Sequence, residues 1–460
     1  MKAQLSPLIP FYASRAPRRH RRGVVFLLLL IALLRPSRVD ATPLRPNCRS
    51  QLDGIIYCVE DHGATHLLIV DLTNPHIRVQ TVMANDVLDV RPPDEERERV
   101  IDMAQRYRDR NVVIAINGDY FGAGRGPEGP TIVQGQRLDT PGTIALNPSR
   151  YRRTTLVLSH YSYASIVPLL AQTQPPFVYR DVMFNAISGG PIILSDGQPA
   201  FEALACLSNR IPANSCRRDR QTAAGVDAPG KTLYLAVSTV RSTGDMASLL
   251  RDYGAVTAMK LDAGGSSQLW YNGRTLLDSD RGVANALLVF VEDRPHHAAE
   301  LIARPIVPII QTGEGGSLPI ELRNTGYLDW TVDRHYGLRL IAGGALMDQT
   351  FLPLPNDVAT AEAARLSLNI QRVSWPGVYE STWQMITPFE RFGPTIALRA
   401  IVIPREANDL RGEIQALLDR AARQSGQRFE KDWPQLAARI RQMIETWVKE
   451  NCEGRRPCAG

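Results

Sequence analysis

The sequence lacks several patterns that would assign its chemistry at once. It contains no HExxH, no CxxC and no clustered Cys and His spacing, so nothing in it predicts a zinc enzyme. It contains no G-x-S-x-G turn, which excludes the nucleophile elbow of an α/β-hydrolase. It also lacks internal repeats and low-complexity tracts. We therefore do not expect a zinc protease, a serine hydrolase of that fold or a repeat scaffold.

Long apolar runs are also scarce. The run Val24–Leu34 holds eleven residues, which is too short to span a bilayer comfortably, and no other stretch is apolar enough. It follows the basic stretch Arg18–Arg22, and Val39–Ala41 offers a small residue for cleavage. We therefore predict a signal peptide over residues 1–41 and a secreted or extracytoplasmic protein, with the cell envelope as one expected setting. An uncleaved N-terminal anchor is the alternative.

The chain has no excess of basic residues once the predicted signal peptide is set aside. The net charge of the 460-residue chain is +6, but residues 1–41 hold eight Lys and Arg and one acid. The rest carries 45 basic and 46 acidic residues, which gives no argument for nucleic-acid binding. Hydrophobic and charged contents of 44% and 22% are those of a soluble globular protein, and the length predicts two or three domains.

The six cysteines fall in close pairs, which agrees with export. Six cysteines allow 15 connectivities, and local pairing is the simplest because each bridge then closes its own loop. The predicted pairs are Cys48 with Cys58, Cys206 with Cys216, and Cys452 with Cys458.

Residues 42–294 read as many strands with few helices, which predicts an α+β domain rather than a regular βαβ alternation. An amphipathic helix is expected within Pro92–Arg110. A second helix is expected from a Thr243 cap to about Tyr253, with Gly254 as its stop.

The remaining chain, residues 295–460, has a different sequence pattern. Residues 295–305 read as a linker, and short strands separated by turns over 306–403 predict a small β-sandwich that resembles an immunoglobulin-like module. Its aromatic residues, among them Trp330, Trp375 and Trp383, are expected to be core fillers rather than a ligand box. Residues 404–460 carry two amphipathic helices and predict a helical hairpin.

Four glycine-containing segments carry the chemistry. They read NGDYF at 117–121, GGPIIL at 189–194, QTAAGVD at 221–227 and LDAGGSS at 261–267. The last is the most informative, because an apolar strand ends in a carboxylate and glycines follow whose backbone N–H groups can approach an anion. Taken alone, this segment fits a hairpin turn with a solvated Asp equally well.

In this set and order the four segments resemble the phosphodiester glycosidase family. Its pattern has an Asn-Gly-Gly-Phe-Phe-like stretch, a Gly-Gly-Pro stretch, an Arg-Thr-Ala-x-Gly stretch and a Leu-Asp-Gly-Gly-Gly-Ser-Ser stretch, and RGVANALLVF at 281–290 resembles the closing strand. The resemblance covers about residues 50–293 and implies a mixed-sheet glycosidase domain. The sequence departs from the pattern at Gln221, where Arg is usual, and at Ala263, where Gly is usual.

The resemblance implies a hydrolase that acts on a glycan or sugar-phosphate substrate, a sugar joined through its anomeric carbon to a phosphodiester. Asp262 is expected at the sugar centre as nucleophile or electrostatic stabiliser, and Asp119 as a second acid/base or metal-linked carboxylate. The substrate-binding residues are expected to be Asn117, Gly118, Gly189, Gly190, Arg220, Thr222, Gly264, Gly265, Ser266 and Ser267. Arg220 would balance the phosphate charge.

The carboxylates do not imply a definite cofactor, although Ca²⁺ would suit oxygen ligands. The rival interpretation is a non-catalytic carbohydrate-binding or cell-wall-binding protein on the same scaffold, which the departures at Gln221 and Ala263 keep open. Neither oligomeric state nor the particular sugar follows from the sequence.

Overall fold

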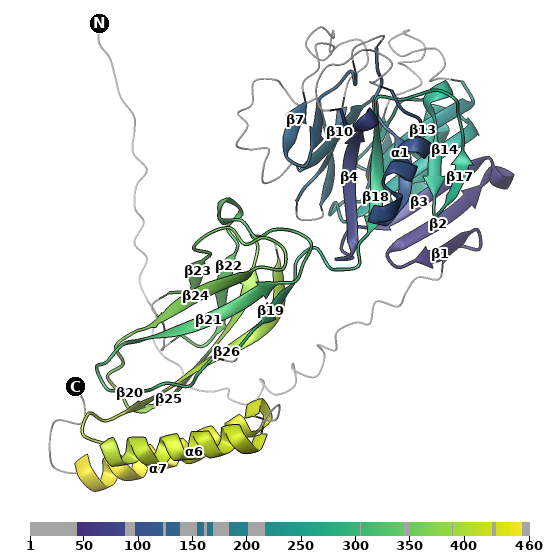
Figure 1. The fold of residues 1–460 in the computed structure, drawn as a ribbon. Helices are drawn as coiled ribbons and strands as arrows, with labels where there is room; N and C mark the ends of the chain where they lie inside the picture. The colour runs from purple at the N-terminus through teal and green to yellow at the C-terminus, as the bar shows by residue number, and fades with distance from the viewer. Residues whose placement is uncertain are drawn as a thin grey trace, which may run out of the picture. The chain divides into compact units, whose positions relative to one another are not determined.

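The computed structural model describes residues 44–87, 97–122, 126–138, 154–160, 163–168, 184–200, 217–303, 305–344, 347, 349–388, 390–425 and 429–452 (Figure 1). Residues 46–460 form one compact unit. The predicted signal peptide lies outside the described residues. None of the helices that the structure describes has the length and apolar character needed to cross a membrane.

An eight-stranded sheet carries most of the N-terminal half. Its strands are β1 (Cys48–Leu52), β2 (Ile55–Glu60), β3 (Thr65–Asp71), β11 (Ile192–Ser195), β12 (Gln198–Pro199), β13 (Asp219–Val226), β14 (Thr232–Arg241) and β15 (Thr257–Lys260), in the order β1-β2-β3-β14-β13-β15-β11-β12. Cys48 and Cys58 stand opposite each other in the β1–β2 hairpin and form a disulfide, which confirms the first predicted pair.

Two five-stranded sheets complete this half. One contains β4 (Ile77–Met83), β5 (Val112–Asn117), β16 (Leu269–Tyr271), β17 (Arg274–Leu277) and β18 (Asn285–Val291), in the order β17-β16-β5-β18-β4. The other contains β6 (Thr131–Val133), β7 (Gln136–Leu138), β8 (Thr154–Leu158), β9 (Ala164–Pro168) and β10 (Asn185–Gly189), in the order β7-β6-β10-β8-β9.

One hydrophobic core joins the three sheets. It contains Leu68 and Leu235 from the first, Ile116 and Leu287 from the second, and Ile187 from the third, all fully buried. The pairings within these sheets are antiparallel, as short hairpin connections favour. Among the described strands, parallel pairing occurs at β20–β26 in the C-terminal half, so the expected mixture of strand directions is found there and not in the three sheets of the N-terminal half.

The structure describes two α-helices in this half. Both begin at a residue other than the one the sequence predicts. The described part of the first is α1 (Val100–Arg106), since the backbone of Glu98 pairs with Val283 instead of joining the helix. The second is α5 (Thr243–Asp252), and its N-cap is Ser242 rather than Thr243. The Ser242 and Asp245 side chains form a capping box there, which satisfies amide groups that the first turn leaves unpaired.

The C-terminal half contains two sheets that share a hydrophobic core. The first has β19 (Ala299–Leu301), β21 (Gly316–Asn324) and β24 (Ala363–Ile370), and the second has β20 (Ile309–Gln311), β22 (Gly337–Ala342), β23 (Phe351–Pro353), β25 (Gly377–Ile386) and β26 (Arg391–Ile403). Trp330 and Trp383 are fully buried in this core. Trp375, which was expected in the core as well, is 67% exposed.

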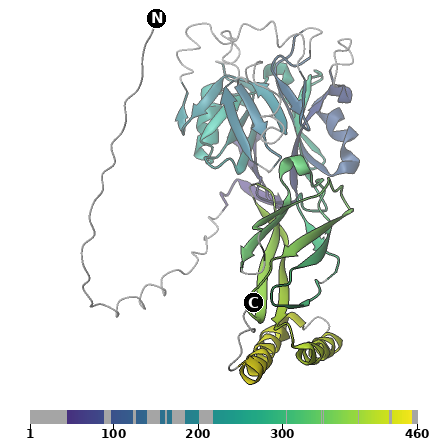
Figure 2. The same ribbon diagram turned by 90° about the vertical axis from the view of Figure 1, so that its left-hand side faces the viewer.

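Two helices, α6 (Asn408–Ser425) and α7 (Phe429–Cys452), follow β26 and run side by side (Figures 1 and 2). Their apolar faces meet at Ile414 and Ile440, both fully buried. Cys452 at the end of α7 is disulfide-bonded, but its predicted partner Cys458 lies outside the described residues. Cys206 and Cys216 lie outside them too.

Gly118, next to the end of β5, provides a test of the core. A Cβ at this position would meet Ile187 Cδ1 at 2.1 Å and Asn285 Oδ1 at 2.3 Å. We therefore expect Gly118→Ala to lower the free energy of unfolding by about 1–3 kcal/mol, measured by urea denaturation. The matched control is Gly412→Ala in α6, where a Cβ meets nothing within 4 Å and helix propensity favours alanine. Equal effects of the two substitutions would contradict the packing.

Candidate functional site

The site forms where the loop from β15 to β16 meets the end of β5. The hub of this junction is Asn117, which is fully buried. Its amide Nδ2 donates to the carbonyl of Asp262 at 2.8 Å, and its Oδ1 accepts from the Gln268 N–H at 3.0 Å. The backbone adds a bond from Asp262 N to Gly118 O at 2.9 Å. One side chain therefore clamps the loop at both ends.

Strand β13 joins the same network through Thr222. Its hydroxyl donates to Asn117 Oδ1 at 3.0 Å and lies 3.0 Å from the Ser267 hydroxyl. All three side chains are fully buried. The segments at 221–227 and 261–267 thus meet the segment at 117–121. Their resemblance to the motifs of one family leads to this expectation. Their polar atoms hold the loop.

The Gly-Gly-Pro segment reaches the junction from β10. The Gly190 N–H donates to Lys260 O at 2.7 Å, and the Tyr120 hydroxyl donates to Gly190 O at 3.0 Å. A Cβ on Gly189 would lie 2.6 Å from the same Lys260 carbonyl. The amide of Gly118 likewise donates to Asn285 O at 3.0 Å. These contacts give Gly118, Gly189 and Gly190 a place in the scaffold, and the amides of Gly118 and Gly190 are already used.

Asp262 is the half-buried carboxylate of the site. Its Oδ1 accepts the Ala263 N–H at 2.8 Å. Burial raises the pKa of this carboxyl above its ordinary value of 3.8, while the Ser266 hydroxyl, the Ala263 amide and the charges of Lys260 and Arg281 oppose that rise. The Ser266 hydroxyl lies beside the carboxylate, but it is buried without a hydrogen bond of normal geometry.

Asp119 has different surroundings, although it was expected to share the chemistry. Its carboxylate is fully buried, and it accepts the Tyr120 N–H at 2.8 Å and the Gly129 N–H at 2.5 Å. Its own N–H donates to Asn285 Oδ1 at 2.8 Å. These bonds hold the backbone on either side of residues 123–125, so the geometry favours a positioning function over direct contact with substrate.

Arg220 and Gln221 point in different directions, as successive residues of a strand do. The Arg220 guanidinium donates to Ser267 O at 2.8 Å and to Asp278 O, which fastens the Asp262 loop to residues beyond β17. The Gln221 side chain points inward, and its Oε1 accepts from Lys260 Nζ at 2.8 Å. The position where the family pattern has Arg therefore faces a different cation.

Lys260 is that cation, and sequence reasoning missed it. It is 2% exposed and stands two residues before Asp262 at the end of β15. Burial lowers the pKa of its ammonium from 10.5 to about 8, while the negative charges of Asp262 and Asp219 counteract this. Lys260, on the neighbouring strand β15, therefore supplies a positive charge beside Gln221, where the family pattern has Arg. The signal was available in the strand TAMK, where a lysine interrupts an otherwise apolar approach to the carboxylate.

Arg281 is a second cation that the sequence analysis did not single out. It is exposed, and its side chain lies beside Gly265, since a Cβ there would meet Arg281 Cδ at 3.5 Å. Its guanidinium also lies 4.9 Å from the ring centre of Phe121, the last residue of the first motif. Its charge lowers the pKa of Asp262 against the larger effect of burial. Its position at the start of RGVANALLVF was the available signal.

The result is a carboxylate with a buried cation behind it and an exposed cation across the loop. None of the hydrogen bonds in the described part of the chain uses the amide N–H groups of Gly264 and Gly265. Such amides, together with Arg281 and the Ser266 hydroxyl, are suited to an anion, while Asp262 is suited to developing positive charge. An anionic leaving group beside a cationic reacting centre fits this arrangement.

The family model described as phosphodiester glycosidase matches residues 110–290. This range contains all four motif segments together with Lys260 and Arg281, and it confirms the resemblance for this part of the chain.

Solved structures give weaker likenesses. A hypothetical protein from Synechocystis shares 18% identity at a TM-score of 0.35, over 55% of this chain and 64% of that one. The catalytic domain of zebrafish N-acetylglucosamine-1-phosphodiester alpha-N-acetylglucosaminidase, auto-inhibited by its pro-peptide, shares 18% identity at a TM-score of 0.39, over 55% of this chain and 86% of that one. TM-scores below 0.5 do not define the fold of the whole chain. A comparison with curated proteins gives no match.

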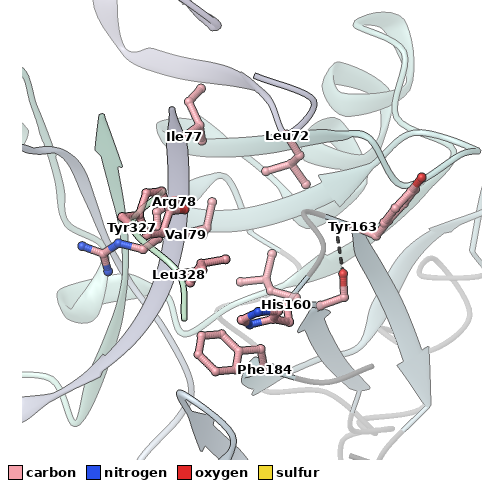
Figure 3. Close-up of a pocket in the computed structure, with 11 residues that line it drawn as sticks. Leu72, Ile77, Arg78, Val79, His160, Tyr163, Phe184, Tyr327 and Leu328 are labelled. Atoms are coloured by element: carbon pink, nitrogen blue, oxygen red, sulfur yellow. Dashed lines mark hydrogen bonds between the residues drawn. The ribbon is translucent and has the colours of Figure 1, made fainter. Parts of the chain in front are cut away.

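A separate cavity of about 40 Å³ lies near β4 and is lined mainly by apolar side chains, with His160, Phe184, Tyr327 and Leu328 at one end (Figure 3). None of the four motif segments contributes to its lining. Its size is that of a water molecule or two rather than a sugar, so it is not a candidate for the substrate.

The lowered pKa of Lys260 predicts how stability depends on pH. The folded chain binds this proton less tightly than the unfolded chain, so the free energy of unfolding gains a term that grows between pH 8 and 10.5. Lys260→Met lacks this term. We expect the wild type to gain on the order of 3 kcal/mol relative to Lys260→Met over that interval, measured by urea denaturation at several pH values.

The control is Lys231→Met, which removes an exposed lysine immediately before β14, a strand of the same sheet. Its stability difference from the wild type is expected to stay constant with pH. A constant difference for Lys260→Met as well would show that Lys260 keeps an ordinary pKa in the folded protein.

Proposed function

We propose that this chain is a phosphodiester glycosidase that hydrolyses sugar-1-phosphodiester linkages in glycans or cell-surface polymers. The observation that carries the proposal is the position of Asp262. Its carboxylate is half-buried, and its backbone carbonyl accepts a hydrogen bond from Asn117 at the junction of the motif segments. The family model over residues 110–290 supports the same class of reaction.

The proposed reaction breaks the bond between the anomeric carbon and the phosphate oxygen. The transition state resembles an oxocarbenium ion, which a carboxylate stabilises by charge or by covalent attack. Asp262 fills this position. Its raised pKa reflects burial, which also strengthens its attraction to a developing positive charge. The phosphodiester is a good leaving group, so stabilising its negative charge matters more than protonating it.

The remaining residues divide between contact and positioning. Arg281, the amides of Gly264 and Gly265, and the hydroxyl of Ser266 are proposed to contact the phosphate or the sugar hydroxyls. Lys260 supplies a buried positive charge from behind, which opposes the rise that burial causes in the pKa of Asp262. The positioning residues are proposed to be Asn117, Thr222, Ser267, Arg220 and Asp119, whose polar groups hold the loop and the strand ends.

Asp119 bears on the rival function. Its two oxygens accept backbone bonds, so the site as described presents one carboxylate to a ligand where retaining glycosidases present two. A sugar-phosphate-binding protein without turnover would need no second carboxylate. The experiment on Asp262 therefore has to separate binding from turnover.

We also propose that the protein works outside the cytoplasm. The Cys48–Cys58 disulfide supports this, because such bonds form and persist in oxidising compartments. The predicted leader over residues 1–41 agrees with export. The C-terminal sheets and helices are proposed to be an immunoglobulin-like module and a hairpin that accompany the glycosidase domain.

Asp262→Asn tests the reaction. With an activated sugar-1-phosphodiester as substrate, we expect kcat to fall on the order of 10³-fold or more, since an amide neither attacks nor stabilises positive charge. The asparagine Oδ1 still accepts the Ala263 N–H, so the loop keeps its hydrogen bond. Sugar-phosphate binding, measured by calorimetry, is expected to persist. Absence of turnover in the wild type, with binding intact, would establish the binding protein instead.

Arg281→Gln tests the anion contact. We expect kcat/KM for the phosphodiester to fall about 10–100-fold, as loss of a charge-assisted hydrogen bond implies, and to fall much less for a neutral aryl glycoside. The matched control is Arg274→Gln on β17, an exposed arginine outside the motif segments. Equal losses for the charged and neutral substrates would remove Arg281 from the phosphate site.

The same variant carries a pH signature. Activity needs ionised Asp262 and is lost as the pH falls through the pKa of its carboxyl. Because the charge of Arg281 lowers that pKa, Arg281→Gln raises it, and the acidic limb of the kcat/KM profile is expected to move to higher pH. A limb that stays in place would show that Arg281 does not act on Asp262.

A further inference from the structure

A cluster of two histidines and a carboxylate lies far along the chain from the motif segments. His296 and His297 follow the last strand of the N-terminal half, and Glu390 lies in the turn between β25 and β26. One ligand atom from each lies within 4.8 Å of the others. His296 Nε2 is 3.1 Å from Glu390 Oε1, and His297 Nδ1 contacts the same oxygen.

The far side of His296 determines which nitrogen carries its proton. His296 Nδ1 lies 2.9 Å from the carbonyl oxygen of Pro75, which can only accept. Nδ1 is therefore the N–H, and in a neutral ring the lone pair of Nε2 points at the Glu390 carboxylate. Two electron-rich atoms at 3.1 Å require a positive charge between them, either a proton or a metal ion.

His297 also has a polar partner on each of its ring nitrogens. Its Nε2 lies 2.8 Å from the Tyr336 hydroxyl, and its Nδ1 faces Glu390. Metal-binding histidines usually have such a partner on the second nitrogen, which fixes the orientation of the ring. Glu390 is held as well, because its N–H donates to the Thr387 hydroxyl at 3.1 Å and its O accepts from the Thr387 N–H at 2.9 Å.

The three proposed ligands differ in their exposure to solvent, and the difference indicates how an ion could enter. The His296 and His297 side chains are 5% and 1% exposed, whereas Glu390 is 38% exposed. An ion can therefore reach the cluster along the carboxylate, and water can complete its coordination there.

We propose that His296, His297 and Glu390 bind a divalent transition-metal ion, with Zn²⁺ as the representative. Two imidazole nitrogens and one carboxylate oxygen suit Zn²⁺, with water as a fourth ligand, and do not suit Ca²⁺ or Mg²⁺. The ion ties residues 296–297 to the β25–β26 turn. Through the bonds of His296 to Pro75, it also supports the turn between β3 and β4. The site is independent of Asp262 and of the proposed glycosidase activity.

The test uses the full chain with a purification tag that contains no histidine. After treatment with EDTA and its removal, Zn²⁺ is titrated against a chromophoric competitor, and thermal unfolding is followed with and without Zn²⁺. We expect one Zn²⁺ per chain and an unfolding midpoint that rises with Zn²⁺ concentration. Glu390→Gln, at an accessible side chain, is expected to weaken binding at least about 100-fold and to abolish the shift in midpoint.

The matched control is His335→Asn, an exposed histidine of the same half at φ 56, a conformation that Asn tolerates. It is expected to bind Zn²⁺ as the wild type does. Co²⁺ in place of Zn²⁺ gives a second readout, a visible absorption band that Glu390→Gln lacks. No stoichiometric binding, or equal binding by Glu390→Gln, would overturn the proposal and leave a proton between His296 and Glu390.

Discussion

The constraint on which the candidate site depends is the burial of the Asn117 side chain. A buried amide has to find its hydrogen-bond partners inside the protein, and here it finds them at both ends of the Asp262 loop and on β13. Residues 263–267 of that loop are Ala, Gly and Ser, which contribute little apolar packing. Its position is set by polar groups at β5 and β13, and these depend in turn on the packing of three sheets around one core. The site is therefore rigid where its sequence looks most flexible.

Much of the fold was predictable because strand formation is encoded locally. The apolar and β-branched residues of Ile77–Met83 favour a strand, and the structure forms β4 over these residues. The end of the helix before Gly254 was predictable too, because a left-handed residue stops it. The start of α1 at Val100 was not, because it follows the pairing of Glu98 with the distant Val283, which one sequence does not reveal. Trp375 shows the same limit, since composition favours a buried tryptophan and only the tertiary structure leaves it exposed.

The carboxylate of the candidate site was predictable, but its two cations, Lys260 and Arg281, were not. The four motif segments pointed to Asp262. The family pattern has Arg at the position of Gln221, so Gln221 itself predicted no cation there. The register that sets Ala223 opposite Lys260 on β15 brings the lysine to Gln221, and register between distant strands is not visible in one sequence. The His296–His297–Glu390 cluster was hidden for a similar reason, because its ligands are 93 residues apart and the histidines read as part of a linker.

The disulfide in the first hairpin has a consequence for solubility. β1 is an edge strand of the eight-stranded sheet, and an edge strand offers unpaired backbone groups to other chains. The Cys48–Cys58 bridge fixes β1 on β2, so the edge cannot detach and uncover the longer, more buried strand beneath it. The opposite edge is β12, only two residues long and ending in Pro199, which has no N–H to donate. The bridge therefore keeps β2 covered by β1, while brevity and Pro199 leave β12 few backbone groups for pairing with another chain.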